Sequence, residues 1–335
     1  MTISAEAPPA PAPRRRVTRE RWITGACWAG VGVWALIAAT RWLGYDGSVW
    51  PLVMFPALTP YLTLAALLPV ALCLFTRRWL AGVAALTVFA ALLGFLAPRA
   101  FGGPDPARGP AVRVMSANLK EGGADPGALV ALVRSLRVDV LAVSELPPRE
   151  LTRLTRAGLT GVLPYAVTNP AWSTTGGTAL FSRYPLTDGQ RLPLVDEFVE
   201  TGAVLHVPGA RPVELTGVHY CAPVDPGQYA CWRYGIARIP PATPTGPVRL
   251  LLGDFNLTMD YGALRTVLDT GYRDAASVVG QGLSTTWPYD GTPVPPLTID
   301  HVLADRRIGV SAAGTYPIRN SDHRAIFAAL ALPAA

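Results

Sequence analysis

Charged residues are missing from three long stretches near the N-terminus. Residues 22–40, 52–75 and 79–96 contain no Asp, Glu, Lys or Arg. Each stretch is close to the roughly 18–20 residues that a helix needs to cross a hydrocarbon core of about 30 Å. Buried helices of a soluble protein rarely run so far without charge, and Trp22, Trp42, Trp50 and Trp79 flank the stretches as interfacial aromatics do. We therefore predict three transmembrane helices.

Basic residues gather on one side of these stretches. Five arginines precede the first, and Arg77 and Arg78 separate the second from the third, whereas the intervening loop holds only Arg41 and Asp46. By the positive-inside rule the N-terminus is cytoplasmic, and three crossings place the rest of the chain outside. We predict a multi-pass protein of the cell membrane with a disordered basic tail (1–20), a membrane anchor (21–97), a Gly/Pro-rich linker (98–110) and an extracytoplasmic domain (111–335).

The outer domain has almost no excess of positive charge, although the whole chain carries +6. Residues 1–98 hold eight basic and three acidic side chains, which leaves 21 and 20 in residues 99–335. A nearly neutral domain is poorly suited to binding a polyanionic backbone. Nucleic acid is therefore a less favoured partner than the lipid bilayer and a phosphate-bearing lipid within it, and no protein partner is inferred.

Cysteine is scarce, with four residues in the chain. Cys27 and Cys73 fall within the apolar stretches and are interpreted as small apolar residues. Cys221 and Cys231 are ten residues apart in a Pro- and Gly-containing segment, where an oxidising exterior would allow them to pair. Because sequence spacing does not show whether their Cα atoms approach within bridging distance, the sequence does not decide whether the two residues form a disulfide.

The outer domain alternates short apolar runs with helix signals, which predicts an α/β fold of two packed sheets covered by helices. Asp125-Pro126 is a typical helix start, residues 148–157 form a second predicted helix, and Asp260 is predicted to cap a third. The predicted strands are 112–117, 138–144, 165–168, 178–182, 203–207, 213–218, 248–252, 298–303 and 325–330.

Polar side chains stand at the ends of several of these strands. Glu145 and Asp322 are hard oxygen donors suited to Mg²⁺, with Mn²⁺ as an alternative. His219 and His323 can donate hydrogen bonds to phosphate oxygens, and Asp254 can accept a proton from an attacking water. The remaining groups have supporting roles: Asn118 and Asn256 can position a phosphate or a water, and Asp300 can orient an imidazole. Together they indicate metal-assisted hydrolysis of a phosphoester.

The motifs in their order resemble the endonuclease/exonuclease/phosphatase superfamily over residues 112–332. They are Asn118, Glu145, Gly177–Arg183, His219, Gly253-Asp254-Phe255-Asn256, Thr286-Trp287, Ile299-Asp300 and Ser321-Asp322-His323. The resemblance implies a four-layer αββα sandwich. It also implies Glu145, Asp322 and Asn118 as metal ligands, and Asp254, His323, His219, Asn256 and Asp300 as catalytic residues.

Three further residues were considered for substrate binding, each with an alternative. Lys120, the only lysine of the chain, is a candidate phosphate contact. Trp287 is either a substrate wall or a packing residue, and Arg183 is either a substrate contact or a structural ion-pair partner. The sequence departs from the family at Ser144, where Gln is frequent, and at Leu119-Lys120, where several members carry an acidic residue. The second departure puts a second metal ion in doubt.

Three membrane spans before such a domain resemble the VanJ-type teicoplanin-resistance proteins of actinomycetes. That narrower resemblance implies action on a lipid-linked (pyro)phosphate of cell-wall synthesis, such as undecaprenyl pyrophosphate, and a contribution to glycopeptide resistance. The alternatives are an extracytoplasmic nuclease or phospholipid phosphodiesterase of the same superfamily, and a binding protein that kept the fold without catalysis.

Overall fold

The computed structural model describes residues 14–105, 108–173, 175–193 and 198–335. These residues form two compact units. The first comprises residues 61–94 and the described residues up to Thr40, and the second comprises residues 41–60 and 95–335.

The apolar N-terminal region is helical, as its composition predicts. Its elements are α1 (Arg14–Leu43), the 3-10 helix η1 (Leu52–Leu58), α2 (Thr59–Ala65), α3 (Leu67–Phe75) and α4 (Trp79–Ala100). Three helical stretches are long and apolar enough to cross a membrane: Thr18–Leu43, Leu52–Phe75 and Trp79–Ala100.

Two expected boundaries differ from the structure. Of the tail predicted to be disordered, residues 1–13 lie outside the described residues, and 14–20 form the first turns of α1. The arginines in this stretch are good helix formers, which explains why the helix begins before the apolar run. The expected linker also begins late, because α4 runs on to Ala100 through Pro98.

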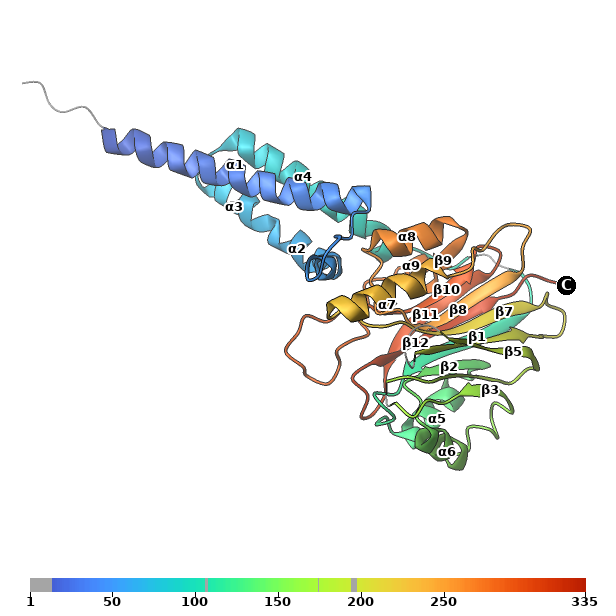
Figure 1. Cartoon of the computed structure of the whole chain (residues 1–335). Helices are drawn as coiled ribbons and strands as arrows, with labels where there is room; N and C mark the ends of the chain where they lie inside the picture. The colour runs from blue at the N-terminus through green and yellow to red at the C-terminus, as the bar shows by residue number, and fades with distance from the viewer. Residues whose placement is uncertain (1–13, 106–107, 174, 194–197) are drawn as a thin grey trace, which may run out of the picture. The chain divides into compact units, whose positions relative to one another are not determined.

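Twelve strands of the second unit, within the described residues, form two six-stranded sheets (Figure 1). One sheet has the order β11-β12-β1-β2-β4-β3 and the other the order β5-β6-β7-β8-β10-β9. The first comprises β1 (Ala111–Asn118), β2 (Val140–Ser144), β3 (Tyr165–Asn169), β4 (Thr178–Ser182), β11 (Gly309–Pro317) and β12 (Arg324–Ala331). The second comprises β5 (Leu186–Pro193), β6 (Val199–Leu205), β7 (Val213–His219), β8 (Val248–Asp254), β9 (Tyr272–Asp274) and β10 (Asp300–Asp305).

Helices cover the outer face of each sheet, so the domain has four layers. α5 (Pro126–Ser135) and α6 (Pro148–Arg156) pack on the first sheet, and α7 (Pro226–Ala237) and α8 (Gly262–Asp269) on the second. A short helix, α9 (Ala275–Val278), joins the core between the sheets. That core is made of the inward-facing apolar residues of both sheets, among them Val114, Val140, Leu250 and Val302. The predicted αββα sandwich is confirmed.

Strand direction brings the polar strand ends to one edge of the sandwich. β1 and β2 are parallel, with α5 between them in the chain, and β7 and β8 are parallel, with α7 between them. β1 faces β8 and β2 faces β7 across the core. β10 and β12 run antiparallel to their neighbours β8 and β1, so their first residues lie at the edge where those strands end.

The segment after β7 contains a helix that the sequence did not predict. α7 starts at Pro226, and the side chain of Asp225 accepts hydrogen bonds from the amides of Gly227 and Gln228. Cys231 lies on this helix and forms a disulfide with Cys221, with the two Cα atoms 5.8 Å apart. The Pro and Gly that suggested a loop occupy the first helical turn, where their cost is small.

The cap predicted for α8 is wrong. Asp260 does not cap this helix, because its carboxylate pairs with Arg99 at 2.7 Å and accepts from the hydroxyl of Thr258. Instead, the side chain of Asp46 accepts hydrogen bonds from the backbone amides of Gly262 and Ala263, at 2.6 and 2.8 Å. A residue more than two hundred positions earlier in the chain therefore supplies the cap.

Candidate active site

Asp254, the last residue of β8, lies at the centre of the polar cluster and is 2% exposed. Its Oδ2 atom accepts a hydrogen bond from Asn118 Nδ2 at 3.1 Å. The same atom lies 3.7 Å from Nε2 of His323 and 4.0 Å from Nε2 of His219. Its Oδ1 atom accepts from the backbone amide of Asn256 at 2.9 Å. The four strand ends therefore converge on one carboxylate.

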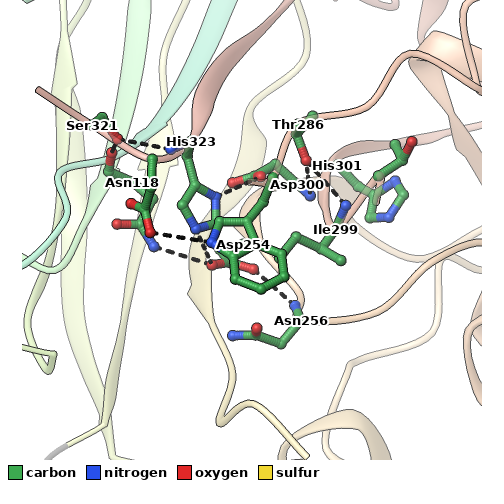
Figure 2. Close-up of polar contacts among 12 residues, drawn as sticks. Asn118, Asp254, Asn256, Thr286, Ile299, Asp300, His301, Ser321 and His323 are labelled. Carbon is green, nitrogen blue, oxygen red and sulfur yellow. Dashed lines mark hydrogen bonds and ion pairs between the residues drawn. The ribbon is translucent and has the colours of Figure 1, made fainter. Parts of the chain in front are cut away.

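His323 is fixed between two carboxylates (Figure 2). Its Nδ1 lies 2.9 Å from Asp300 Oδ2, and its backbone amide donates to the hydroxyl of Ser321. Burial acts to lower the pKa of His323, but Asp300 and Asp254 outweigh it and raise the pKa to about 10. The imidazole is therefore protonated at neutral pH, and its Nε2 proton points toward Asp254.

Burial also changes the acidity of Asp254 itself. Desolvation, reinforced by the negative charge of Asp300, raises its pKa to about 6, while His323 and His219 oppose the rise. A carboxylate whose pKa approaches neutrality can accept a proton from water and release it again. Asp254, His323 and Asp300 thus form a buried array suited to proton transfer.

His219 faces the same centre from the end of β7. Its Nε2 lies 3.7 Å from Glu145 Oε1, and its ring centroid lies 5.2 Å from that of Phe198. Desolvation lowers the pKa of His219. This imidazole is therefore neutral more readily than His323, and it can donate or accept a hydrogen bond according to its tautomer.

Glu145 follows β2 in the left-handed region of backbone conformation, with φ of 55°. Such a conformation costs a non-glycine residue of the order of 1–3 kcal/mol. It is held by two hydrogen bonds to the carboxylate, from Asn118 Nδ2 at 2.9 Å and from the amide of Glu121 at 2.6 Å. Burial raises the pKa of Glu145, and these two donors oppose the rise. The strained turn aims the carboxylate into the site.

Asp322 and Glu145 form a pair of acidic side chains beside the proton-transfer array. The charge of Asp322 is close enough to raise the pKa of Glu145. Its Oδ2 accepts from Trp287 Nε1 at 3.1 Å, whereas Oδ1 is buried with no hydrogen-bond partner among the described residues. An orphaned buried carboxylate oxygen beside another carboxylate is the environment that a divalent cation would satisfy. The residues expected to hold Mg²⁺ therefore fit such an ion.

Asp254, Asp300 and His323 also offer three potential ligand atoms within 4.8 Å of one another. We do not assign the metal to them, because both ring nitrogens of His323 already face carboxylates. The oxygen-rich group of Glu145, Asp322 and Asn118 matches the preference of Mg²⁺ better.

Comparison with known proteins agrees with this geometry. Residues 115–323 match the model of the endonuclease/exonuclease/phosphatase family, which is more than half of the chain. The chain belongs to this family. No curated protein matches it. Members of the family are phosphoesterases and nucleases, and they typically use a divalent metal.

Several solved structures share the fold of this chain at low identity. An endonuclease/exonuclease/phosphatase from Beutenbergia cavernae is 16% identical, over 67% of this chain and 72% of that chain, with a TM-score of 0.52. Zebrafish (D. rerio) TDP2 complexed with a single-strand DNA product is 15% identical, over 66% and 98%, with a TM-score of 0.51. A functionally unknown conserved protein from Enterococcus faecalis is 14% identical, over 66% and 100%, with a TM-score of 0.50.

Arg183 is the one predicted residue that the structure separates from the rest. Arg183 comes just after the last residue of β4. The first residue of that strand, Thr178, pairs with Ser144, which precedes Glu145, so Arg183 lies at the opposite end of the strand from the site. Its guanidinium pairs with Asp139 at 3.1 Å. We therefore exclude Arg183 from the candidate site, because an ion pair at the opposite edge of the sheet holds it.

Lys120 and Trp287 lie at the rim of the family site. Lys120 is half-exposed and pairs with Asp290 at 2.8 Å, while its backbone amide donates to Asn118 Oδ1. Trp287 both donates to Asp322 and packs its ring 6.3 Å from that of His323. These contacts show that Trp287 packs within the site, and its contact with a substrate stays a prediction.

Residues that sequence reasoning did not select hold the site in place. The carbonyl of Tyr220 accepts from Asn256 Nδ2 at 2.7 Å, and Ser321 Oγ donates to the carbonyl of Asn118 at 2.9 Å. Thr286 Oγ1 accepts from the amides of Ile299 and Asp300. Ser321 and Thr286 belong to motifs quoted above, but their supporting role depends on long-range contacts. No sequence motif identified Tyr220 as part of the site, although it directly follows His219.

His301, next to Asp300, faces away from the centre (Figure 2). Its ring nitrogens lie near Asp274 and the carbonyl of Leu257 instead. Alternation along β10 explains why neighbouring residues serve the site and the core.

Proposed function

We propose that this protein is a membrane-anchored, divalent-metal-dependent phosphoesterase that acts outside the cytoplasmic membrane. Its proposed substrate is a lipid-linked (pyro)phosphate of cell-wall synthesis, such as undecaprenyl pyrophosphate, and its action would contribute to glycopeptide resistance. The convergence of Asn118, His219 and His323 on the Asp254 carboxylate, within 3.1–4.0 Å, is the observation that carries the hydrolytic part.

The residues divide the work of hydrolysis. Asp254, held in orientation by the Asn256 amide, aligns a water and takes its proton as the water attacks the terminal phosphorus. The bond from that phosphorus to the bridging oxygen breaks, so that inorganic phosphate is released and the bridging oxygen leaves with the lipid phosphate. His323, kept protonated by Asp300, donates a hydrogen bond to a phosphoryl oxygen, and His219 supports another. A cation on Glu145, Asp322 and Asn118 would supply neutralisation of the charge that develops on the phosphate.

The membrane anchor and the charge of the outer domain support the lipid substrate. An enzyme and a substrate that share one membrane meet on a surface, which raises their effective concentration. The nearly neutral domain does not favour a polyanionic strand over a single phosphate group.

The test uses the purified full-length protein in detergent with Mg²⁺. A polyprenyl pyrophosphate, a phospholipid and DNA are offered in parallel, and released phosphate, released headgroup and nicked DNA are measured. We expect phosphate release from the polyprenyl pyrophosphate. Turnover of the phospholipid or of DNA alone would instead support the alternative substrates of the same family.

Asp254→Ala and His323→Ala should each lower kcat/KM by at least about a hundredfold, because the first removes the proton acceptor and the second removes a hydrogen-bond donor to the phosphoryl oxygen. His206→Ala and Asp269→Asn are matched controls outside the site and should keep activity within about twofold of the parent. An Asp254→Ala variant that hydrolyses every substrate like the parent would overturn the hydrolytic role.

A further inference from the structure

A pocket lies on the outer face of the β5-β6-β7-β8 sheet, away from the catalytic cluster. Its cavity has a volume of about 350 Å³, within the roughly 300–1,000 Å³ range of small-molecule sites. Strands β5 to β8 line it together with the residues that follow α7. None of the residues assigned above to metal binding or catalysis lines this cavity.

Glu200 is the buried polar group of the pocket. Its neighbour Thr201 bonds to the hydroxyl of Thr178 across the sandwich at 2.7 Å, so Glu200 points to the opposite face of β6. The residue is 8% exposed, and it hydrogen-bonds with the hydroxyl of the buried Tyr220. Its Oε1 atom is buried with no partner in the described part of the chain. An occupant of the cavity that donates a hydrogen bond would satisfy this oxygen.

The charges around the pocket favour a cationic occupant. The charge of Arg249 is paired with that of Glu214, because its guanidinium donates to Glu214 Oε2 at 2.9 Å and also to the carbonyl of Pro241. The remaining lining charges are Glu200, Asp188 and Arg238. The guanidinium of Arg238 lies over the ring of Tyr234 at 5.1 Å, on the exposed side of α7. With Glu200 in its ionised form, these lining charges leave a balance of minus one.

The walls of the pocket suit a hydrocarbon chain. Leu192 of β5, Leu251 of β8 and Ile239 after α7 line the cavity beside the polar groups. We propose that the pocket binds a small aliphatic amine or diamine, with an ammonium group on the Glu200 carboxylate and the Tyr220 hydroxyl, and with its methylenes against these three side chains.

The acidity of Glu200 agrees with this occupant. Burial raises its pKa to about 7, although Tyr220 and Arg238 act to lower it. The carboxylate is therefore only partly ionised in the empty pocket, and a bound cation would stabilise the ionised form.

The test is calorimetric titration of the full-length protein in detergent. The probe is 1,4-diaminobutane, with 1,4-butanediol as a neutral partner of similar length. We expect saturable binding of one diamine and at least about tenfold weaker binding of the diol, because the diol leaves the carboxylate unpaired. Equal affinity for the two probes, or binding of neither, would overturn the proposal.

Variants locate the bound amine. Glu200→Gln keeps the shape of the side chain and should weaken diamine binding at least about tenfold. Leu192→Trp, at a half-buried position, should weaken it by filling the cavity even if Glu200→Gln proves unstable. Asp269→Asn on the surface and Asp254→Asn in the catalytic cluster should bind the diamine like the parent. Loss of binding in Asp254→Asn alone would place the amine at the catalytic carboxylates and refute the pocket.

Discussion

At the scale of single residues, the catalytic cluster is held by a few short contacts between strand ends. Asp300 pairs with Asp254 in the β8–β10 ladder, and its carboxylate holds Nδ1 of His323 at 2.9 Å, which aims Nε2 at the Asp254 carboxylate. We therefore regard Asp300 as a positioning residue. This role differs from the roles proposed for Asp254 and His323, which act on the attacking water and on the phosphate.

Asp300→Asn should lower kcat by roughly a hundredfold or more and leave KM nearly unchanged. The amide keeps the shape but removes the charge that stabilises the imidazolium and holds its orientation. Steady-state kinetics with the preferred substrate gives both constants. A variant that raises KM at an unaltered kcat would show that Asp300 acts in substrate binding instead.

We expect Glu200 to make the stability of the protein depend on pH. Its pKa rises from 4.5 to about 7 on folding, so the folded state holds the proton more tightly than the unfolded state. The stability is fully present below pH 4.5 and is lost as the pH rises through about 7, at a total of about 3 kcal/mol. The side chain of Glu200→Gln cannot ionise, so the stability of that variant should not fall over the same pH range.

Thermal unfolding of the parent and of Glu200→Gln at pH 5 and pH 8 measures the difference. We expect the parent to lose stability relative to the variant at the higher pH. A difference between the two proteins that does not change with pH would contradict the burial of an ionisable Glu200.

At the scale of elements, parts of the anchor region fold with the catalytic domain. Val53 and Ala57 of η1 pack in the same apolar cluster as Trp232 of α7 and Leu264 of α8. Asp46 caps α8, and Arg99, near the end of α4, pairs with Asp260 just before it. α8 therefore depends on residues that precede the catalytic domain in the chain.

Asp46→Ala should destabilise the second unit by about 1 kcal/mol, because two amides of the first turn of α8 lose their acceptor. Asp46→Asn retains a capping oxygen and should restore most of the loss. The measurement is a thermal or denaturant unfolding curve of the full-length protein. An unchanged curve for Asp46→Ala would contradict the cap.

At the scale of the whole molecule, composition divides the chain into an apolar region and a nearly neutral domain. Three helical stretches are long and apolar enough to span a bilayer. The arginines before the first stretch and at Arg77-Arg78 set the predicted direction of insertion.

Protease treatment of intact cells tests that direction. A C-terminal epitope should be removed, and an N-terminal epitope should be protected until the membrane is permeabilised, because three crossings put the two ends on opposite sides. A C-terminal epitope that resists the protease in intact cells would contradict an extracytoplasmic domain and, with it, the cell-wall substrate.

The sequence alone determined the features that depend on local pattern. Uncharged length predicted the apolar helices, short apolar runs predicted most strands, and motif order indicated the family and nearly all of the polar cluster. Predictions from local sequence were wrong where the interacting residue lies far away in the chain. Asp260 has the local appearance of a cap, but its carboxylate lies against Arg99, and the helix takes its cap from Asp46.

Only the tertiary structure decided which polar residues meet. The direction of β1, β2, β7 and β8 brings Asn118, Glu145, His219 and Asp254 to one edge, while β4 carries Arg183 to the other. The predicted strand 203–207 did not include Glu200, whereas β6 begins at Val199 in the structure, and the pocket beside Glu200 is lined by residues from four strands and from the segment after α7. Contacts of this kind join residues far apart in the chain, and no short segment contains the information that specifies them.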